Sequence, residues 1–359
     1  MTTAFNEKLR LGSLTEKAFE RMPNSETAEI LKTILQDSKP GADSDDFEEL
    51  LGALESMGRS VRLVGRLAES AEENDESLQG SLRKAFEHIA RMHRYGKSHV
   101  LETIFKLTTE DFQGRQHLIE AIAEIVGSTS GSITFGNLNY DTTILSALLS
   151  ECHDDMCDMG DGRKAARQKV GSTEFDVQPL RSTDDLPDKK VCLLHLHGSV
   201  TYWHRRNKTD TGIKLRNSQI GQSEIFDEYR ENAIEWRPSV VLTTQNRKSR
   251  RVENNPFKYA YSKFSAALIG APKWLIIGYS FKDSSVNAML RECIRESDSQ
   301  PDILVVGYNG DPTRAAVMDA LGWNEDLAYE GDGVLNVISD GAQSFVKGIA
   351  WRRFARKAE

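Results

Sequence analysis

The chain has 359 residues, of which 39% are hydrophobic and 28% charged, with a formal net charge of −8 at pH 7. This length and these fractions of hydrophobic and charged residues exclude an intrinsically disordered protein and a small domain that needs cross-links to fold. The negative charge argues against general nucleic-acid binding, which needs a basic surface, so we expect no direct contact with nucleic acid.

Cysteine content and hydropathy predict a cytoplasmic protein without membrane contact. Four cysteines are too few to form a disulfide framework in a chain of this length. No apolar run reaches the ~18 residues that span a bilayer. The polar stretch from Met1 to Leu14 lacks the apolar core of a signal peptide.

Residues 1–130 carry helical patterns almost throughout. Ser13 and Glu16 have the spacing of a capping box and predict the start of a first helix, and Asp45 is a candidate cap for the second. Apolar residues recur at helical spacing in three further stretches, residues 47–57, 78–107 and 112–126. We predict a mainly helical region, 1–130, that packs on the remainder of the chain.

From residue 130 onward, strand patterns alternate with helix patterns. Apolar, β-rich runs predict strands at residues 132–135, 191–196, 239–243, 274–277 and 303–306. Helices are expected at residues 141–149, 256–269, 284–296, 312–321 and 342–354. Runs that are apolar throughout fit strands buried on both faces of a parallel sheet. The alternation predicts an α/β fold: a Rossmann-like, doubly wound parallel sheet over residues 131–359, with the N-terminal helices as an insertion layer.

In such a sheet, ligands bind beyond the carboxyl ends of the strands, where three segments carry polar residues. The first is Asn137-Leu138-Asn139-Tyr140-Asp141, in which an Asn amide can orient a hydroxyl or a water and Asp141 can accept hydrogen bonds at a helix start. The alternative is that these residues only form the turn and cap the helix.

The second segment contains His195 and His197, followed by Gly198. A histidine beside open backbone can act as a general base near neutral pH, although a histidine held by backbone groups is the alternative. If the strand continues, side-chain alternation places both imidazoles on one face, so a metal site with His204 is conceivable.

The third segment, Gly278-Tyr279-Ser280-Phe281-Lys282-Asp283, follows the fourth predicted strand. Gly278 permits close approach of the backbone, and Ser280 and Asp283 offer polar contacts to a ribose or phosphate. An ordinary turn capped by Asp283 or Ser284 is the alternative.

The order of these segments resembles that of the sirtuin superfamily. The matching motifs are Asn139-Tyr140-Asp141, His197-Gly198, Arg237-Pro238-Ser239-Val240-Val241 and Gly278-Tyr279-Ser280, within residues 130–310. The Asn-Tyr-Asp and Gly-Tyr-Ser-Phe-x-Asp variants look like the bacterial sirtuin-like subgroup, many of whose members deplete NAD in antiphage defence.

The resemblance implies NAD as the substrate and assigns roles to the strand-end residues. Asn139 would position the nicotinamide ribose or a water, and His197 would act as the general base. The other predicted NAD contacts are Asn137, Asp141, Gly278, Ser280 and Asp283.

The chain departs from the family pattern in two places. Protein-deacetylating sirtuins carry paired Cys-x-x-Cys motifs after the His-Gly strand, whereas no cysteine occurs between Gly198 and Gly278, so we expect no zinc there. The family also opens with a strand and a Gly-Ala-Gly-x-Ser loop that cradles the pyrophosphate, and this sequence contains no such loop. We expect that the sequence begins downstream of that unit, by ~20 to 40 residues.

The sequence thus predicts an NAD hydrolase that releases nicotinamide and ADP-ribose, as the toxic effector subunit of a bacterial antiphage complex. The resemblance implies a homo-oligomer and, as candidate partners, a HerA-like ATPase or an Argonaute. A second hypothesis is a catalytically impaired nucleotide-sensing or assembly subunit, which the missing loop favours. A third is a metal-dependent hydrolase that uses His195, His197 and His204.

Overall fold

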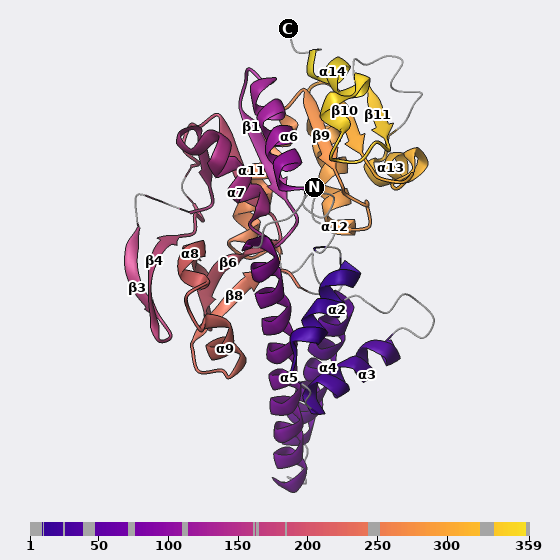
Figure 1. The fold of residues 1–359 in the computed structure, drawn as a ribbon. Helices are drawn as coiled ribbons and strands as arrows, with labels where there is room; N and C mark the ends of the chain where they lie inside the picture. The colour runs from indigo at the N-terminus through magenta and orange to yellow at the C-terminus, as the bar shows by residue number, and fades with distance from the viewer. Residues whose placement is uncertain are drawn as a thin grey trace.

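The computed structural model describes residues 9, 11–23, 26–38, 47–70, 76–109, 114–160, 162, 165–183, 185–242, 252–323 and 334–356. The predicted cap Asp45 and the predicted strand end at Thr243 lie outside these ranges. Within them the protein combines parallel sheets with helices, which confirms the predicted α/β class with a helical N-terminal region. Figure 1 shows the helices before residue 110 at one end of the molecule and the parallel strands, together with the helix at residues 115–127, at the other.

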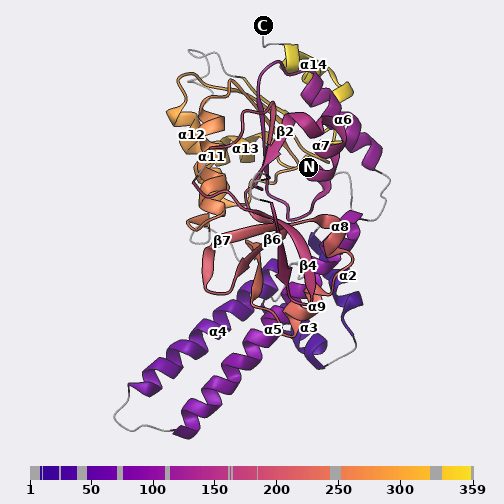
Figure 2. The ribbon, with the colours of Figure 1, turned by 90° about the vertical axis from the view of Figure 1, so that its left-hand side faces the viewer.

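The N-terminal helices are α2 (Leu11–Arg21), α3 (Glu26–Ser38), α4 (Phe47–Glu69), α5 (Glu76–Thr109) and α6 (Arg115–Gly127). In Figure 2, α4 and α5 run side by side as a long hairpin that projects away from the rest of the chain. Across the described residues, no helix has both the length and the apolarity that crossing a bilayer requires.

The predicted capping box is wrong. Helix α2 already begins at Leu11, so Ser13 lies inside its first turn and does not precede the helix, as a cap must. The helix is instead fixed by its apolar face, on which Leu14 and Ala18 lie four residues apart and are buried in the core, as is Met22 directly after the helix.

The parallel strands form two separate three-stranded sheets. The first has the order β1 (Ile133–Asn137), β5 (Val191–His195) and β2 (Met156–Asp158). The second has the order β11 (Leu335–Ile338), β10 (Asp302–Val306) and β9 (Lys273–Ile277). Four of these strands lie where the sequence predicts them, since long apolar runs are the strongest strand signal in the chain.

Helices follow or separate the parallel strands, as the alternating pattern predicts. They are α7 (Thr143–Cys152), α11 (Phe257–Ile269), α12 (Ser284–Glu296), α13 (Arg314–Leu321) and α14 (Ile349–Arg356). The predicted helix over 342–354 is interrupted, because Gly348 adopts an extended backbone between a 3-10 turn (Phe345–Lys347) and α14. A second 3-10 turn, His153–Asp155, follows α7.

A five-stranded antiparallel sheet was not predicted. Its order is β3 (Ala166–Val170), β4 (Thr173–Pro179), β7 (Lys208–Leu215), β6 (Gly198–Arg205) and β8 (Trp236–Val240). The prediction of a parallel strand at residues 239–243 is therefore wrong, because β8 pairs antiparallel with β6. Two short helices, α8 (Asn217–Ile220) and α9 (Ile225–Arg230), lie between β7 and β8.

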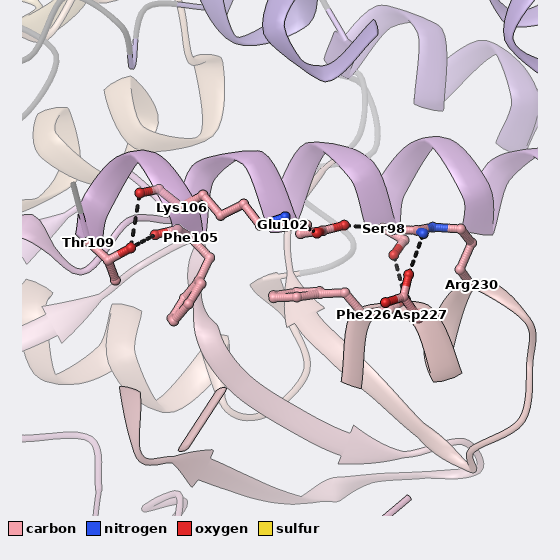
Figure 3. Close-up of polar contacts among 8 residues, drawn as sticks. All are labelled: Ser98, Glu102, Phe105, Lys106, Thr109, Phe226, Asp227 and Arg230. Carbon is pink, nitrogen blue, oxygen red and sulfur yellow. Dashed lines mark hydrogen bonds and ion pairs between the residues drawn. The ribbon is translucent and has the colours of Figure 1, made fainter. Parts of the chain in front are cut away.

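Helix α5 docks on this antiparallel region through α9 (Figure 3). The Ser98 hydroxyl donates to the Phe226 carbonyl at 2.7 Å, and the Arg230 guanidinium bonds Glu102 at 2.6 Å. The ring of Phe105 lies 6.1 Å from that of Phe226. Helices α2 to α5 thus share one apolar core with the antiparallel sheet, while α6 packs with the parallel strands.

Candidate functional site

A cavity of about 1110 Å³ lies at the carboxyl ends of the parallel strands and extends along β1 and β9. Small-molecule sites typically occupy ~300 to 1000 Å³, so this space can hold a ligand the size of a dinucleotide. The seven residues predicted to act on NAD all line it: Asn137, Asn139, Asp141, His197, Gly278, Ser280 and Asp283. The candidate metal ligands His195 and His204 do not line it. The structure therefore brings together strand ends that are far apart in the sequence.

Asn137, at the end of β1, is engaged with the protein itself. Its side-chain oxygen accepts a hydrogen bond from the Asn139 backbone N–H at 3.1 Å, which forms the turn. Its side-chain nitrogen lies 3.2 Å from Nδ1 of His195 and, being a donor, makes that nitrogen the acceptor. Asn137 thereby shapes the loop that presents Asn139, as the turn-forming alternative anticipated.

His195 is fully enclosed, and burial lowers its pKa to about 4. The imidazole is therefore neutral near pH 7, with its proton on Nε2 because Nδ1 accepts from Asn137. Its ring meets Tyr202 edge-on at 5.5 Å. His195 is a buried structural histidine that supports the end of β1.

The Asn139 loop is tied to two other parts of the fold. The Tyr140 hydroxyl lies 2.9 Å from the Val241 carbonyl oxygen and 2.5 Å from a carboxylate oxygen of Glu48 on α4. Asp141 accepts from the Thr143 backbone N–H at 2.9 Å and so bonds the first residue of α7. These bonds hold Asn139 half-buried in the cavity wall.

His197 lies between two tyrosine rings, Tyr140 and Tyr261, each with its centroid 6.5 Å away. Its Nε2 is 3.1 Å from the Tyr261 hydroxyl and 3.6 Å from a carboxylate oxygen of Asp283. The first distance is a hydrogen bond, whereas the second is a contact with a nearby negative charge. An imidazole beside a carboxylate can take up a proton, since the carboxylate stabilises the imidazolium.

Gly198 makes the turn that places His197 at the cavity. Its φ of +86° is a conformation that residues with a side chain rarely adopt. A Cβ at this position would lie 2.1 Å from the Ser239 carbonyl oxygen. The chain therefore leaves the parallel sheet at His195 and enters the antiparallel sheet at Gly198.

This turn also corrects the predicted arrangement of the histidines. Because β5 ends at His195, the two imidazoles do not continue along one strand face and have different surroundings. The Nδ1 of His204 is bonded to the Ser239 hydroxyl at 2.7 Å. Among the described residues, no three His, Cys, Asp or Glu side chains are grouped as a metal site would require.

The Gly278 loop contributes the opposite wall. Gly278 has a φ of +62° and donates its N–H to the Val306 carbonyl at 2.9 Å. Asp283 caps α12 by accepting from the N–H groups of Ser285 and Val286 at 3.0 and 3.2 Å. Its other oxygen lies 3.6 Å from Nε2 of His197, so this one carboxylate both starts a helix and contacts the imidazole.

Tyr261 was missed by the sequence analysis. It lies within α11, where an aromatic residue in a helical pattern carries no functional signal, and its contact with His197 spans 64 positions. Burial raises the pKa of the Tyr261 hydroxyl, and the charge of Asp283 raises it further. The hydroxyl therefore stays protonated at neutral pH and forms its hydrogen bond with Nε2 of His197.

Residues 134–323, more than half of the chain, match the family model described as the SIR2-like domain. This span contains β5, β9 and β10, all of β1 but its first residue, and the whole antiparallel sheet. None of the curated proteins compared with the chain is similar enough to count as a match.

Proposed function

Since this chain belongs to the SIR2-like family, whose domain indicates an NAD-related function, we propose that it hydrolyses NAD to nicotinamide and ADP-ribose. The observation that carries the proposal is that Asn139 and His197 line one cavity at the carboxyl ends of parallel strands. Ligands of open α/β sheets bind at such edges.

The reaction breaks the bond between the nicotinamide nitrogen and the anomeric carbon of the ribose. A water oxygen forms the new bond to that carbon, nicotinamide leaves, and the transition state resembles an oxocarbenium ion. In this proposal Asn139 orients the ribose or the water, and His197 accepts the proton that is released. Asp283, 3.6 Å from the imidazole, stabilises the charge that His197 then carries.

The described cavity walls offer few free donors for the pyrophosphate of NAD. Lys282 lines the cavity, but N–H groups at the starts of α7 and α12 are already bonded to Asp141 and Asp283. This observation favours a second candidate function, a nucleotide-sensing or assembly subunit with impaired catalysis. It also agrees with the expectation that a Gly-Ala-Gly-x-Ser loop supplies those donors in the family.

Incubation of the purified protein with NAD distinguishes the two candidates. Release of nicotinamide, followed by chromatography, supports hydrolysis. Saturable NAD binding by calorimetry without nicotinamide release supports the second candidate. If the protein neither releases nicotinamide nor binds NAD, both candidate functions are contradicted.

We further propose that NAD loss serves as the toxic output of a bacterial antiphage complex, in which this chain assembles with itself and with an ATPase or Argonaute partner. The support is the resemblance of the Asn-Tyr-Asp and Gly-Tyr-Ser-Phe-x-Asp motifs. Cellular NAD should fall during phage infection in cells that carry the wild-type system, and it should stay constant with His197→Ala.

A further inference from the structure

Two of the four cysteines lie opposite each other on adjacent strands. Cys157 on β2 and Cys192 on β5 are directly paired in the parallel register of these strands. Residues that are directly opposite in a parallel pair point to the same face of the sheet, so the two thiols lie side by side. Both cysteines are free. The first parallel sheet therefore holds a pair of adjacent, reduced thiols.

The spacing of paired strands is suitable for a disulfide. Neighbouring strands lie ~4.8 Å apart, within the ~4.4 to 6.8 Å that a disulfide requires between its Cα atoms. The Cβ atoms of directly opposed parallel residues are about as far apart as the strands, slightly beyond the ~3.5 to 4.5 Å that is usual for a disulfide. The bond thus requires a small movement of one strand, and the strain that remains makes it easy to reduce.

The strand that carries Cys157 is the one better able to move. β2 has three residues and lies at the end of its sheet within the described part of the chain, whereas β5 lies between β1 and β2. Cys157 is half-buried, and Cys192 is only 8% exposed. A reagent from solvent therefore meets Cys157 more readily than Cys192.

The two thiols differ in acidity as a nucleophile and its resolving partner do. A hydrogen bond with Cys192 lowers the pKa of Cys157 and outweighs the opposite effect of burial. The same bond, together with burial, raises the pKa of Cys192. Of the nearby charges, Asp158 raises the pKa of Cys157, while Arg181 and Lys189 lower it. Cys157 is thus the thiol that more readily forms a thiolate, the reactive form, and Cys192 stays protonated beside it.

The other two cysteines are bonded to backbone carbonyls instead. The Cys152 thiol donates to the Leu148 carbonyl at 3.1 Å, and the Cys293 thiol donates to the Ser265 carbonyl at 3.8 Å. Burial raises the pKa of both thiols. Cys152 and Cys293 are therefore internal controls for the reactivity of the paired thiols.

From this geometry we infer that Cys157 and Cys192 are an oxidation site, at which a hydroperoxide converts the two thiols into a reversible disulfide between β2 and β5. Low thiol pKa, access from solvent and an adjacent resolving cysteine are the features of such sites. The inference does not depend on NAD hydrolysis.

The reaction with hydrogen peroxide has two steps. The Cys157 thiolate attacks one peroxide oxygen, the O–O bond breaks, and hydroxide leaves and recovers the proton that the thiol had released, which makes water. Cys157 is then a sulfenic acid. The sulfur of Cys192 attacks the Cys157 sulfur, the S–O bond breaks, and the oxygen leaves as water with the Cys192 proton. The two thiols thus lose two electrons and two protons, and the peroxide is reduced to two water molecules.

Treatment of the full chain with hydrogen peroxide tests the site. Thiol titration after denaturation should fall from four groups to two, and dithiothreitol should restore all four. Mass spectrometry of the digest should identify the cross-linked peptides of Cys157 and Cys192, two hydrogen atoms lighter than the separate peptides. The double variant Cys152→Ser/Cys293→Ser is the matched control and should also lose two thiols. A constant thiol count, a disulfide that includes Cys152 or Cys293, or a disulfide between two copies would overturn the proposal.

Single variants separate the roles of the two thiols. In Cys192→Ser the resolving thiol is missing, so Cys157 should remain a sulfenic acid that dimedone traps. In Cys157→Ser, Cys192 should stay unmodified at the same peroxide concentration. Dimedone labelling of Cys192 as strong as that of Cys157 would overturn the assignment of Cys157 as the nucleophile.

A trivalent arsenical tests the pair in the wild-type chain, without oxidation. One molecule of phenylarsine oxide bridges two adjacent thiolates, so it should protect Cys157 and Cys192 from alkylation and leave Cys152 and Cys293 reactive. Cys157→Ser should abolish the protection. Equal alkylation of all four cysteines with and without the arsenical would show that the two sulfurs are not adjacent and would overturn the proposal.

Discussion

The imidazole of His197 and the hydroxyl of Tyr261 form a hydrogen bond of 3.1 Å that connects the turn after β5 to helix α11. Because burial and the charge of Asp283 both raise the pKa of Tyr261, its hydroxyl remains protonated at neutral pH. The bond orients the one histidine that lines the cavity. It gives the candidate site a supporting contact that can be removed without changing the catalytic candidates themselves.

Replacing the two catalytic candidates should abolish NAD turnover while the fold persists. His197→Ala removes the proposed base, a role worth ~100- to 10,000-fold in rate, and Asn139→Ala removes orientation of the ribose or water. Nicotinamide release and the unfolding midpoint should be measured together. His153→Ala changes an exposed histidine outside the cavity and should keep full activity. Full turnover by either site variant would refute the assignment.

Tyr261→Phe should lower kcat by up to ~10-fold and leave KM nearly unchanged. A single hydrogen bond contributes ~1 kcal/mol, and this one orients the base without touching the substrate. Tyr202→Phe removes another buried hydroxyl, which has no hydrogen-bond partner among the described residues, and serves as the control. A rise in KM with constant kcat would show that Tyr261 contacts the substrate instead.

The sequence was sufficient for four of the six described parallel strands and for seven of the residues that line the cavity. β1, β5, β9 and β10 are dense in apolar residues, and the polar residues that follow β1, β5 and β9 stand out against them. Because the carboxyl ends of parallel strands meet at one edge, predicting the strands also predicted where the candidate site lies.

The antiparallel sheet could not be predicted in the same way. β3 reads Ala-Arg-Gln-Lys-Val and β7 reads Lys-Thr-Asp-Thr-Gly-Ile-Lys-Leu, so neither shows the apolar run of a buried strand. The apolar run Val240-Val241-Leu242 begins at the last residue of β8, but such a run fits either kind of sheet. The pairing of β8 with β6 depends on the turn at Gly198, where β6 begins. This pairing joins residues far apart in the sequence, so no local sequence pattern predicts it.

Gly198→Ala should destabilise the protein by at least ~2 kcal/mol. The methyl group would meet the Ser239 carbonyl oxygen at 2.1 Å, and the residue would be held at a φ of +86°. Gly65→Ala, within α4, meets no atom within 4 Å and should stabilise by ~0.5 to 1 kcal/mol through helix propensity. Urea unfolding of both variants measures the contrast, and similar stabilities would contradict the strain at Gly198.

Acid should weaken the fold through His195. Its pKa is about 4 in the folded protein and 6.5 ordinarily, so between these values the unfolded chain binds more protons. The contribution of His195 to the free energy of unfolding is therefore fully present above pH 6.5. It decreases as the pH falls toward 4, by at most ~1.4 kcal/mol per pH unit. His99 behaves in the same direction, since burial also lowers its pKa to about 4. The free energy of unfolding should therefore be measured over this pH range for the wild type and for His195→Gln. It should change less with pH in the variant.

The docking of α5 on α9 should depend measurably on the pair of Glu102 and Arg230. Their side chains are 19% and 17% exposed and 2.6 Å apart, so solvent screens them only partly. A double-mutant cycle with Glu102→Gln and Arg230→Gln should give a coupling of ~1 to 2 kcal/mol. The exposed pair of Arg167 and Asp176, 76% and 44% exposed at 3.6 Å, should give ~0.5 kcal/mol or less.

The pH dependence of this coupling follows from the carboxylate. Burial alone would raise the pKa of Glu102, but the bonds from Lys106 and Arg230 outweigh it and lower the pKa below its ordinary value of 4.5. A lowered carboxyl pKa stabilises the folded state above the ordinary value, and this contribution is lost as the pH falls through the folded value. The coupling should therefore be constant from pH 7 to pH 5 and decrease below ~4.5. A coupling that disappears already at pH 6, or that matches the exposed pair at pH 7, would show that the contact does not hold α5 against α9.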